Sequence, residues 1–270
     1  MSLNCNYSGL IPLMHMSKNY SDERNRWYLD HQWFFLKKTV PAGGNESIFF
    51  WYDIKTFTDF LASYAITPKS YLRIYFASIN GMLDLIYAVQ DNNNPNAELY
   101  FRFTGGSFMS VPKGAPNQPG TASYWVNEYM TKKAPEIQKN VPTDTIPTRA
   151  LKHKFENLHE FMNEILMQGP TGIKAYISSY TDHEPPGIPA NMMFVNFVFT
   201  SKDASATEQD VFIDDCPNYI IRKKLTVAYW KKRKSLGLVD KTGSQRLMFD
   251  FDNATLCPPD TNCQALLTLP

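Results

Sequence analysis

This chain of 270 residues lacks the features that mark several common classes of protein. No apolar run approaches the ~18 residues that a membrane-spanning helix needs. Four cysteines are too few for a disulfide scaffold and favour a reducing compartment. Lys and Arg together number 27 and Asp and Glu 26, so no global field recruits nucleic acid or an anionic membrane. We therefore expect a cytoplasmic protein with no membrane span.

The motifs of the commonest enzymes are also missing. The sequence contains no P-loop, no GxGxxG after an expected strand, no HExxH, no GxSxG and no EF-hand loop. These absences argue against the commonest nucleotide-binding and hydrolase folds, but they leave an enzyme of another kind open. We expect no cofactor and no bound metal.

Aromatic residues, by contrast, are abundant. The chain has 18 Phe, 15 Tyr and 5 Trp within a hydrophobic content of 43%, while charged residues make up 20%. This composition is typical of a folded domain with a large core and excludes disorder, collagen and coiled coil for most of the chain. The length fits one large domain or two small ones.

The clearest local pattern is a β-hairpin over residues 71–89. Alternating apolar residues lead into Asn80-Gly81, which suits a type I′ turn because both central residues need a positive φ. A helix is expected before it, over about residues 53–66 with Asp53 as N-cap, and a further strand after it, at 99–103.

This helix and hairpin have a counterpart later in the chain. The apolar stripe of the first helix recurs 101 positions later as Phe155, Leu158, Phe161, Met162 and Ile165. The strand 173–179 keeps that offset from 72–78, and the return strand 195–200 matches 83–88. Three positions are identical between 54–78 and 155–179, namely Phe60/Phe161, Tyr75/Tyr176 and Ser78/Ser179.

The shared apolar phase predicts two helix–β-hairpin units, related by internal duplication or alike by chance. The expected class is α+β with a mainly antiparallel sheet. Residues 1–105 form the first unit and 106–148 a connection rich in Pro and Gly, helical only at 124–133. Residues 149–270 form the second unit, with a strand over 211–214, a basic helix over about 217–236, a last strand at 246–251 and a cysteine-containing tail.

Two short stretches carry a family resemblance. The hairpin strand Leu72-Arg-Ile-Tyr-Phe-Ala and the tail Cys257-Pro-Pro…Cys263 resemble small proteins of Bacteroidetes-type bacteria, which have an R-I-Y-F-like hairpin and a C-P-P-x-C-like tail. Here three residues separate Pro259 from Cys263, which departs from that pattern. The likeness covers roughly residues 47–90 and the last 20. It implies a bacterial, intracellular origin and carries over no catalytic residue.

The spacing of Cys257 and Cys263 leaves three interpretations open. Five residues separate the two thiols, which is enough for a local disulfide or for half of a metal site. The other cysteines, Cys5 and Cys216, lack the spacing that would complete a zinc site. Structural or spectator cysteines are therefore the favoured interpretation.

A polar cluster lies in the long loop of the second hairpin. Asp182, His183 and Glu184 precede Pro185-Pro186, and three titratable side chains in a loop suit a metal site or acid–base chemistry. The simpler interpretation is a solvated polar loop.

The strongest charge feature is the expected basic helix. Seven cations and no acid lie between Cys216 and Ser235, and Tyr229 and Trp230 stand among them. Such a segment can contact phosphates and stack on bases, or it can be a solvated helix face with cations near its C-terminus. The residues are Arg222, Lys223, Lys224, Lys231, Lys232, Arg233 and Lys234.

Two further spacings carry less weight. Glu156-x-x-His159 resembles half of a di-iron motif, but the equivalent positions of the first unit are Lys55 and Thr58, so no second copy exists. Cys216 and Arg222 have the spacing of cysteine phosphatases, yet Pro217 removes a loop amide that phosphate binding would use.

Together these observations favour a non-enzymatic binding or interaction module with a protein partner. The partner would occupy a cleft between the two units or the aromatic faces of the hairpins, rimmed by loops 104–123 and 180–191. One alternative is an enzyme that uses His183 or His159 with neighbouring carboxylates. The other is contact with nucleic acid or another polyanion through residues 222–234.

Overall fold

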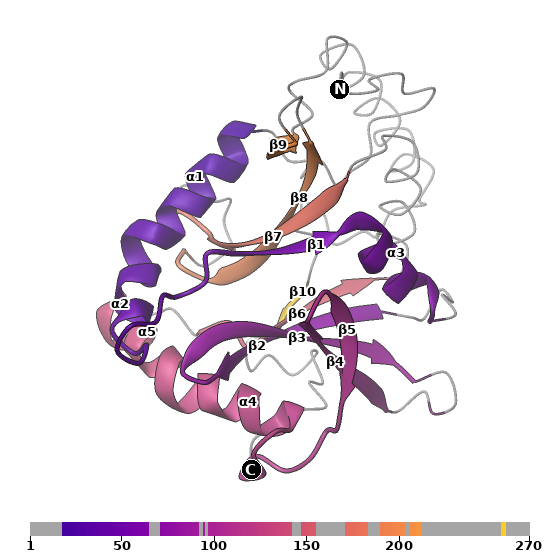
Figure 1. Ribbon diagram of the computed structural model, residues 1–270. Helices are drawn as coiled ribbons and strands as arrows, with labels where there is room; N and C mark the ends of the chain where they lie inside the picture. The colour runs from indigo at the N-terminus through magenta and orange to yellow at the C-terminus, as the bar shows by residue number, and fades with distance from the viewer. Residues whose placement is uncertain are drawn as a thin grey trace, which may run out of the picture.

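The protein folds into two antiparallel sheets covered by helices, as Figure 1 shows for the computed structural model. The structure describes residues 18–64, 71–91, 94, 97–141, 147–154, 171–182, 190–202, 206–211 and 255–257. The α+β class with mainly antiparallel pairing is confirmed. The statements below concern these residues.

Sheet A has four strands in the order β1-β7-β8-β9, and sheet B has six in the order β10-β6-β2-β3-β4-β5. The strands of sheet A are β1 (Phe49–Asp53), β7 (Gly172–Ser179), β8 (Met193–Lys202) and β9 (Glu208–Val211). Those of sheet B are β2 (Tyr71–Ile79), β3 (Met82–Gln90), β4 (Glu98–Thr104), β5 (Ser107–Val111), β6 (Ala150–Lys154) and β10 (Thr255–Cys257).

The described helices form three continuous segments, two of which contain a π-helical turn. The first runs through α1 (Lys18–Tyr28), the π turn η1 (Leu29–Trp33) and α2 (Phe34–Lys37). The second is α3 (Ile54–Ala62), which begins after Asp53 as predicted, because the Asp53 carboxylate accepts the Thr56 amide at 2.9 Å. The third runs through α4 (Ala122–Glu128), η2 (Tyr129–Lys133) and α5 (Ala134–Asn140).

These elements stack in four layers (Figure 1). The helix α1 packs on β7 of sheet A and α4 packs on β2 of sheet B. The inner faces of both sheets share one hydrophobic core, to which α3 adds Phe57, Phe60 and Leu61. Aromatic rings fill the end of this core under α3, where Phe60 stacks on Phe108 with ring centres 4.1 Å apart. The aromatic excess of the sequence is thus largely a core between two sheets.

The strand before each hairpin pairs in the other sheet. β1 pairs with β7, and β6 pairs with β2. A shift of 101 positions converts one pairing into the other, because Phe49 lies opposite Tyr176 and Ala150 lies opposite Tyr75. Pairing of this kind links the predicted units 1–105 and 149–270 through both sheets.

Further features repeat at nearly the same offset. The π turn η1 begins at Leu29 and η2 at Tyr129, and a helix of each segment packs on the equivalent strands β7 and β2. The helix expected over 152–167 lies outside the described residues from 155 on, and its predicted start was wrong, because residues 152–154 belong to the strand β6. The duplication therefore remains a prediction, now accompanied by matching register.

Local structure agrees with the predicted turn and extends other elements. Asn80 and Gly81 have φ of 54° and 78°, as a type I′ turn requires. The connection 106–148 contains β5 and the helical segment 122–140, so the helix predicted at 124–133 was too short. Ile173 lies opposite Phe199, and the equivalent Leu72 lies opposite Val89. Phe199 is therefore equivalent to Val89, two residues beyond the Tyr87 that the predicted match of the return strands gave.

Candidate functional site

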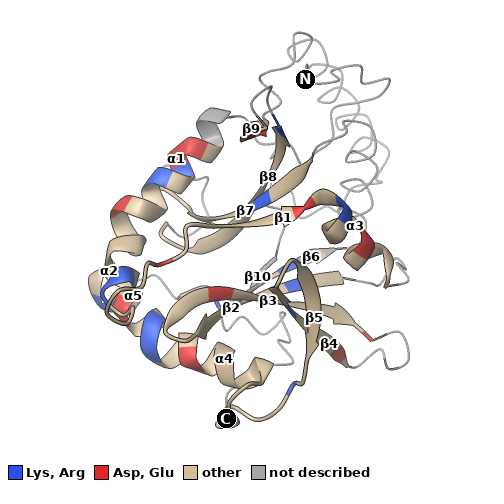
Figure 2. Cartoon of the chain, viewed as in Figure 1, with Lys and Arg blue, Asp and Glu red and all other residues tan. Residues whose placement is uncertain are grey.

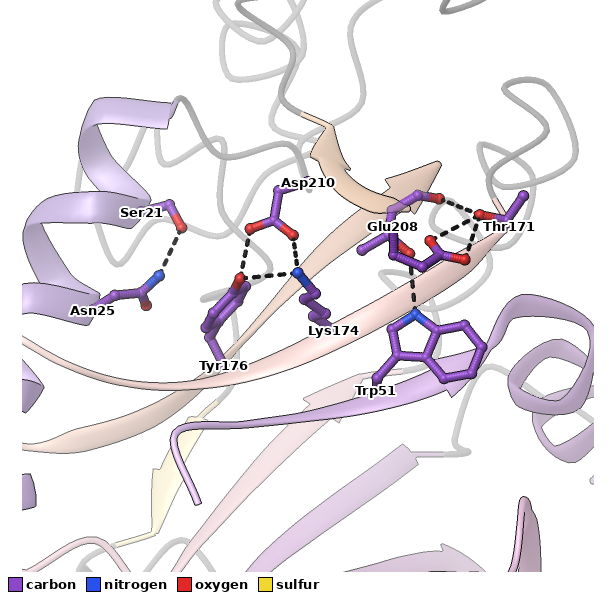
Figure 3. A network of polar contacts seen from close by, with 9 residues as sticks. Ser21, Asn25, Trp51, Thr171, Lys174, Tyr176, Glu208 and Asp210 are labelled. Atoms are coloured by element: carbon purple, nitrogen blue, oxygen red, sulfur yellow. Dashed lines mark hydrogen bonds and ion pairs between the residues drawn. The ribbon is translucent and has the colours of Figure 1, made fainter. Parts of the chain in front are cut away.

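The outer face of sheet A carries a network of a cation, a tyrosine and a carboxylate (Figure 3). The Lys174 Nζ lies 2.7 Å from the Asp210 Oδ1, and the Tyr176 hydroxyl donates to the Asp210 Oδ2 at 2.5 Å. The Lys174 Nζ and the Tyr176 hydroxyl are 3.5 Å apart. We call these three residues the open triad, because about 16% of the Lys174 side chain and 24% of the Asp210 side chain remain exposed.

Strand alternation brings the three side chains to one face. Lys174 and Tyr176 are two residues apart on β7 and therefore point the same way. Asp210 lies on β9, and β8 runs between the two strands. Val198 lies opposite Lys174 on β8 and is buried, and Asp210 lies opposite Thr200 of the same strand, so the lysine spans β8 to reach the carboxylate.

The chemical state of Tyr176 follows from this geometry. Burial raises the pKa of its hydroxyl well above the usual value, and the hydrogen bond to the Asp210 carboxylate raises it further. The phenol therefore keeps its proton at neutral pH and acts as a hydrogen-bond donor. A tyrosine held in this way is unsuited to the role of general base.

An apolar edge borders the open triad. β1 is the outermost strand of sheet A, and Phe49 and Trp51 expose 39% and 38% of their surface. The Lys174 Nζ lies 5.1 Å from the centre of the Phe49 ring. Trp51 donates its indole N–H to the Thr200 Oγ1 at 3.2 Å, and its ring covers Gly172, where a Cβ would meet the indole at 2.4 Å. Aromatic, cationic and carboxylate groups thus share one accessible face.

Sheet B holds an equivalent network at equivalent positions. Arg73, Tyr75 and Glu98 form what we call the buried triad, in which the Arg73 guanidinium pairs with Glu98. The Tyr75 hydroxyl donates to the Glu98 Oε2 at 3.0 Å, and the Arg73 Nη1 donates to the Tyr75 hydroxyl at 3.1 Å. The side chains of Arg73 and Glu98 expose 2% and 0%, so this copy is closed to solvent.

The helix next to each triad also differs between the two sheets. Under α1 the contact is polar: Asn196 donates to the Ser21 Oγ at 2.8 Å, and Ser178 donates to the Asn25 Oδ1 at 2.5 Å. Asn25 in turn donates to the Ser21 Oγ (Figure 3). Under α4 the contact is apolar and consists of a buried cluster on β2, β3, β4, β6 and α4. Its members include Ala77, Ala88, Ala122, Val126 and Ala150. The outer face of sheet A therefore combines polar groups with access to solvent.

Sequence reasoning did not identify either triad, although one signal was present. Tyr75/Tyr176 is one of three identities between the two repeated stretches, and two residues earlier each strand has a cation, Arg73 or Lys174. The carboxylates follow at a different offset because the hairpin loops differ in length. Pairing the cations with Glu98 and Asp210 required the strand order.

Of the residues predicted as sites, the structure describes Asp182 and Cys257. Asp182 is exposed in the turn after β7. Cys257 lies on β10 opposite Ala150. The other candidates lie outside the described residues, so their arrangement stays a prediction. They are His183, Glu184, His159, Glu156, Cys216, Arg222, Lys223, Lys224, Tyr229, Trp230, Lys231, Lys232, Arg233, Lys234 and Cys263.

Charge and metal-binding groups show no concentration in the part of the chain that the structure describes. Positions of basic and acidic residues are scattered over its helices and strands in Figure 2. Within the same ranges no group of three or more His, Cys, Asp or Glu side chains is placed to hold a metal ion. None of the described helices is long and apolar enough to cross a membrane.

Comparison of the chain with models of protein families, with curated proteins and with solved structures finds no match.

Proposed function

We propose that this chain is a cytoplasmic bacterial binding module without catalytic activity, and that it binds a protein partner at the outer face and edge of sheet A. The observation that carries the proposal is the exposed apolar strip Ile48, Phe49 and Trp51 beside the open triad. Exposed apolar residues that adjoin a few oriented polar groups are typical of interaction sites.

The chemistry of the open triad supports binding over catalysis. The Asp210 carboxylate already accepts hydrogen bonds from Lys174 and Tyr176, and the raised pKa of Tyr176 keeps its hydroxyl protonated. Proton transfer at neutral pH needs a group whose pKa lies near the working pH. Fixed donors and acceptors next to an indole ring are better suited to orient a ligand.

A peptide selection tests this proposal directly. The immobilised full chain is presented with a phage-displayed library of random peptides, and enriched sequences are synthesised and measured by fluorescence anisotropy. We expect saturable binding that Trp51→Ala weakens at least about tenfold, because truncation of an interface tryptophan costs more than ~1.4 kcal/mol. Phe49→Ala serves as the second variant, since it leaves the contact of Trp51 with Thr200 in place.

The matched control is Met109→Ala, which removes a similarly exposed apolar side chain from the edge strand β5 of sheet B. This variant should bind the selected peptides as the unchanged chain does. Circular dichroism melts of all variants separate loss of binding from loss of folding. The proposal is wrong if no peptide is enriched over the bare support, or if Met109→Ala weakens binding as much as Trp51→Ala.

A further inference from the structure

We infer that the partner binds as an extended segment that adds a fifth strand to sheet A, antiparallel to β1. This inference rests on the proposed function and specifies the binding mode and the chemistry of the partner. It draws on three observations: the direction of the backbone groups of β1, the occupant of the equivalent edge in sheet B, and the side chains along the edge.

The backbone of β1 has a free hydrogen-bonding edge among the described strands. The Ile177 amide donates to the Ile48 carbonyl at 3.0 Å, and the Ile54 amide donates to the Thr171 carbonyl at 3.2 Å. In an antiparallel pair the bonded residues alternate, so the even-numbered residues of β1 bond to β7. The amide and carbonyl groups of Phe49 and Trp51 therefore point away from the sheet.

Sheet B shows what occupies this edge in the equivalent place. β6 corresponds to β1 in register, and its outer edge is paired with β10. Ala150 lies opposite Cys257 and Lys152 lies opposite Thr255, and these two β6 residues are equivalent to Phe49 and Trp51. A short antiparallel strand thus fits the edge of β6, whereas none of the strands in the described ranges pairs with the outer edge of β1. The equivalent addition would complete the correspondence.

The edge of β1 also lacks the devices that usually protect an exposed strand. Soluble proteins discourage strand addition with proline, lysine or a bulge at the edge. Residues 48–53 read Ile-Phe-Phe-Trp-Tyr-Asp, with no proline and no lysine, and β1 pairs with β7 residue by residue without a bulge. Three of these side chains are large, apolar and exposed.

Register defines the chemistry of the incoming segment. A residue opposite Phe50 shares the inner face of the sheet, where Phe50 packs against the core, so an aliphatic residue fits there. Its two neighbours lie opposite Phe49 and Trp51 on the outer face, one strand away from Lys174. We therefore expect selected peptides to contain an aliphatic residue flanked by residues that pack on aromatic rings.

Proline substitution at residue 49 separates strand addition from binding by side chains alone. Phe49→Pro removes an outward-facing amide that does not bond to β7, whereas Phe49→Ala removes the ring and keeps that amide. Phe49→Pro loses one backbone hydrogen bond to the peptide and places the proline ring at the edge of β1. It should therefore weaken peptide binding about tenfold more than Phe49→Ala does. Equal weakening by the two variants would overturn strand addition.

Peptide variants give a second measurement that leaves the protein unchanged. Each selected peptide is resynthesised with N-methyl groups on alternate residues, in the two possible phases. An antiparallel strand bonds through every second amide, so one phase should abolish measurable binding and the other should preserve it. Binding that tolerates both phases contradicts strand addition.

The outcomes distinguish failure of strand addition from failure of the proposed function. Peptides that need Trp51 but tolerate both methylation phases leave the proposed function standing and overturn the inference. Absence of any selected peptide overturns both. Sedimentation of the full chain tests the remaining occupant: a dimer that Phe49→Pro dissociates would assign the edge to a second copy and overturn a separate partner.

Discussion

Tyr75 and Tyr176 occupy the same place in two sheets and make the same hydrogen bond. Tyr75 lies on β2, which pairs with β6, and Tyr176 lies on β7, which pairs with β1. Each tyrosine donates its hydroxyl to a carboxylate two strands away in its own sheet. A cation two residues earlier completes each network. The correspondence therefore extends from register to a three-residue polar constellation.

The two copies differ in solvent access, and this difference predicts different energetics. A charge left alone in a buried site is costly, whereas a charge near solvent is rehydrated when its partner is lost. We expect Arg73→Met to lower the free energy of unfolding by roughly 3–5 kcal/mol, because Glu98 would remain buried without its cation. Urea denaturation of the purified variant measures this loss.

Two controls distinguish a buried charge from lost packing. The double variant Arg73→Met with Glu98→Leu removes both charges and should recover much of the stability. Lys174→Met breaks the open triad and should cost less than Arg73→Met, because Asp210 retains access to water. A larger loss for Lys174→Met would contradict the assignment of the buried triad as the structural copy.

A second buried ion pair joins residues 38–48, which connect α2 to β1, to the third helical segment. The Lys133 ammonium of η2 pairs with Glu46 and donates to the Thr39 Oγ1 at 2.9 Å, while Glu46 also accepts the Leu83 amide at the hairpin turn. Lys133→Met should lower the free energy of unfolding by about 3–5 kcal/mol, since Glu46 is fully buried. Chemical denaturation provides the measurement.

The neighbouring residue supplies a matched control for that variant. Lys132 is exposed and pairs with Glu128 on the same helical segment, so Lys132→Met removes an ammonium from the same turn. Its denaturation midpoint should coincide with that of the unchanged chain. Similar losses for both lysines would show that the methionine disturbs the helix and that the buried pair is not the cause.

Most of the local fold could be predicted from the sequence, because its signals are local. Asp53 marks the N-cap of α3, and Asn80-Gly81 predicts the turn of the β2–β3 hairpin. Apolar phase identified the second hairpin. The exchange of β1 and β6 between the sheets was not predictable, because one apolar strand of five residues fits either neighbour and only the assembled core selects between them.

The candidate site was harder to predict than the fold. Its members lie on strands that are far apart in sequence. Asp210 comes close to Lys174 and Tyr176 only because β9 and β7 both pair with β8, on its two sides. The sequence drew attention instead to compact clusters such as Asp182, His183 and Glu184. Proximity in sequence is visible without a structure, whereas proximity across three strands is not.

Trp51 covers a glycine, which makes Gly172 a sensitive position. A Cβ built at Gly172 would lie 2.4 Å from the Trp51 Nε1 and 2.7 Å from the Thr200 Oγ1. Gly172→Ala should therefore displace the indole and lower the free energy of unfolding by roughly 1–3 kcal/mol, as overpacking does. Thermal denaturation gives the loss, and a red shift of tryptophan emission reports the displaced ring.

A double variant tests the cause of that effect. In Gly172→Ala with Trp51→Ala the obstructing indole is absent, so the glycine substitution should cost far less than it does in the unchanged chain. Equal costs in the two backgrounds would mean that Gly172 is needed for another reason and that contact with the Trp51 ring is not the cause.

His153 should make the fold sensitive to acid. It is fully buried on β6, and burial lowers the pKa of its imidazole from the usual 6.5 to about 3. Below pH 6.5 the unfolded chain binds a proton that the folded chain does not, so stability falls as the pH drops from 6.5 towards 3. For one such group the slope approaches about 1.4 kcal/mol per pH unit.

Substitution of His153 isolates this contribution from that of the carboxylates. The free energy of unfolding is measured at pH 7 and pH 5 for the unchanged chain and for His153→Phe, which keeps an aromatic ring beside Phe197. The unchanged chain should lose more stability between the two pH values than the variant does, because only its imidazole gains a proton on unfolding. Identical losses would mean that His153 is protonated equally in the folded and unfolded chains, contrary to its burial.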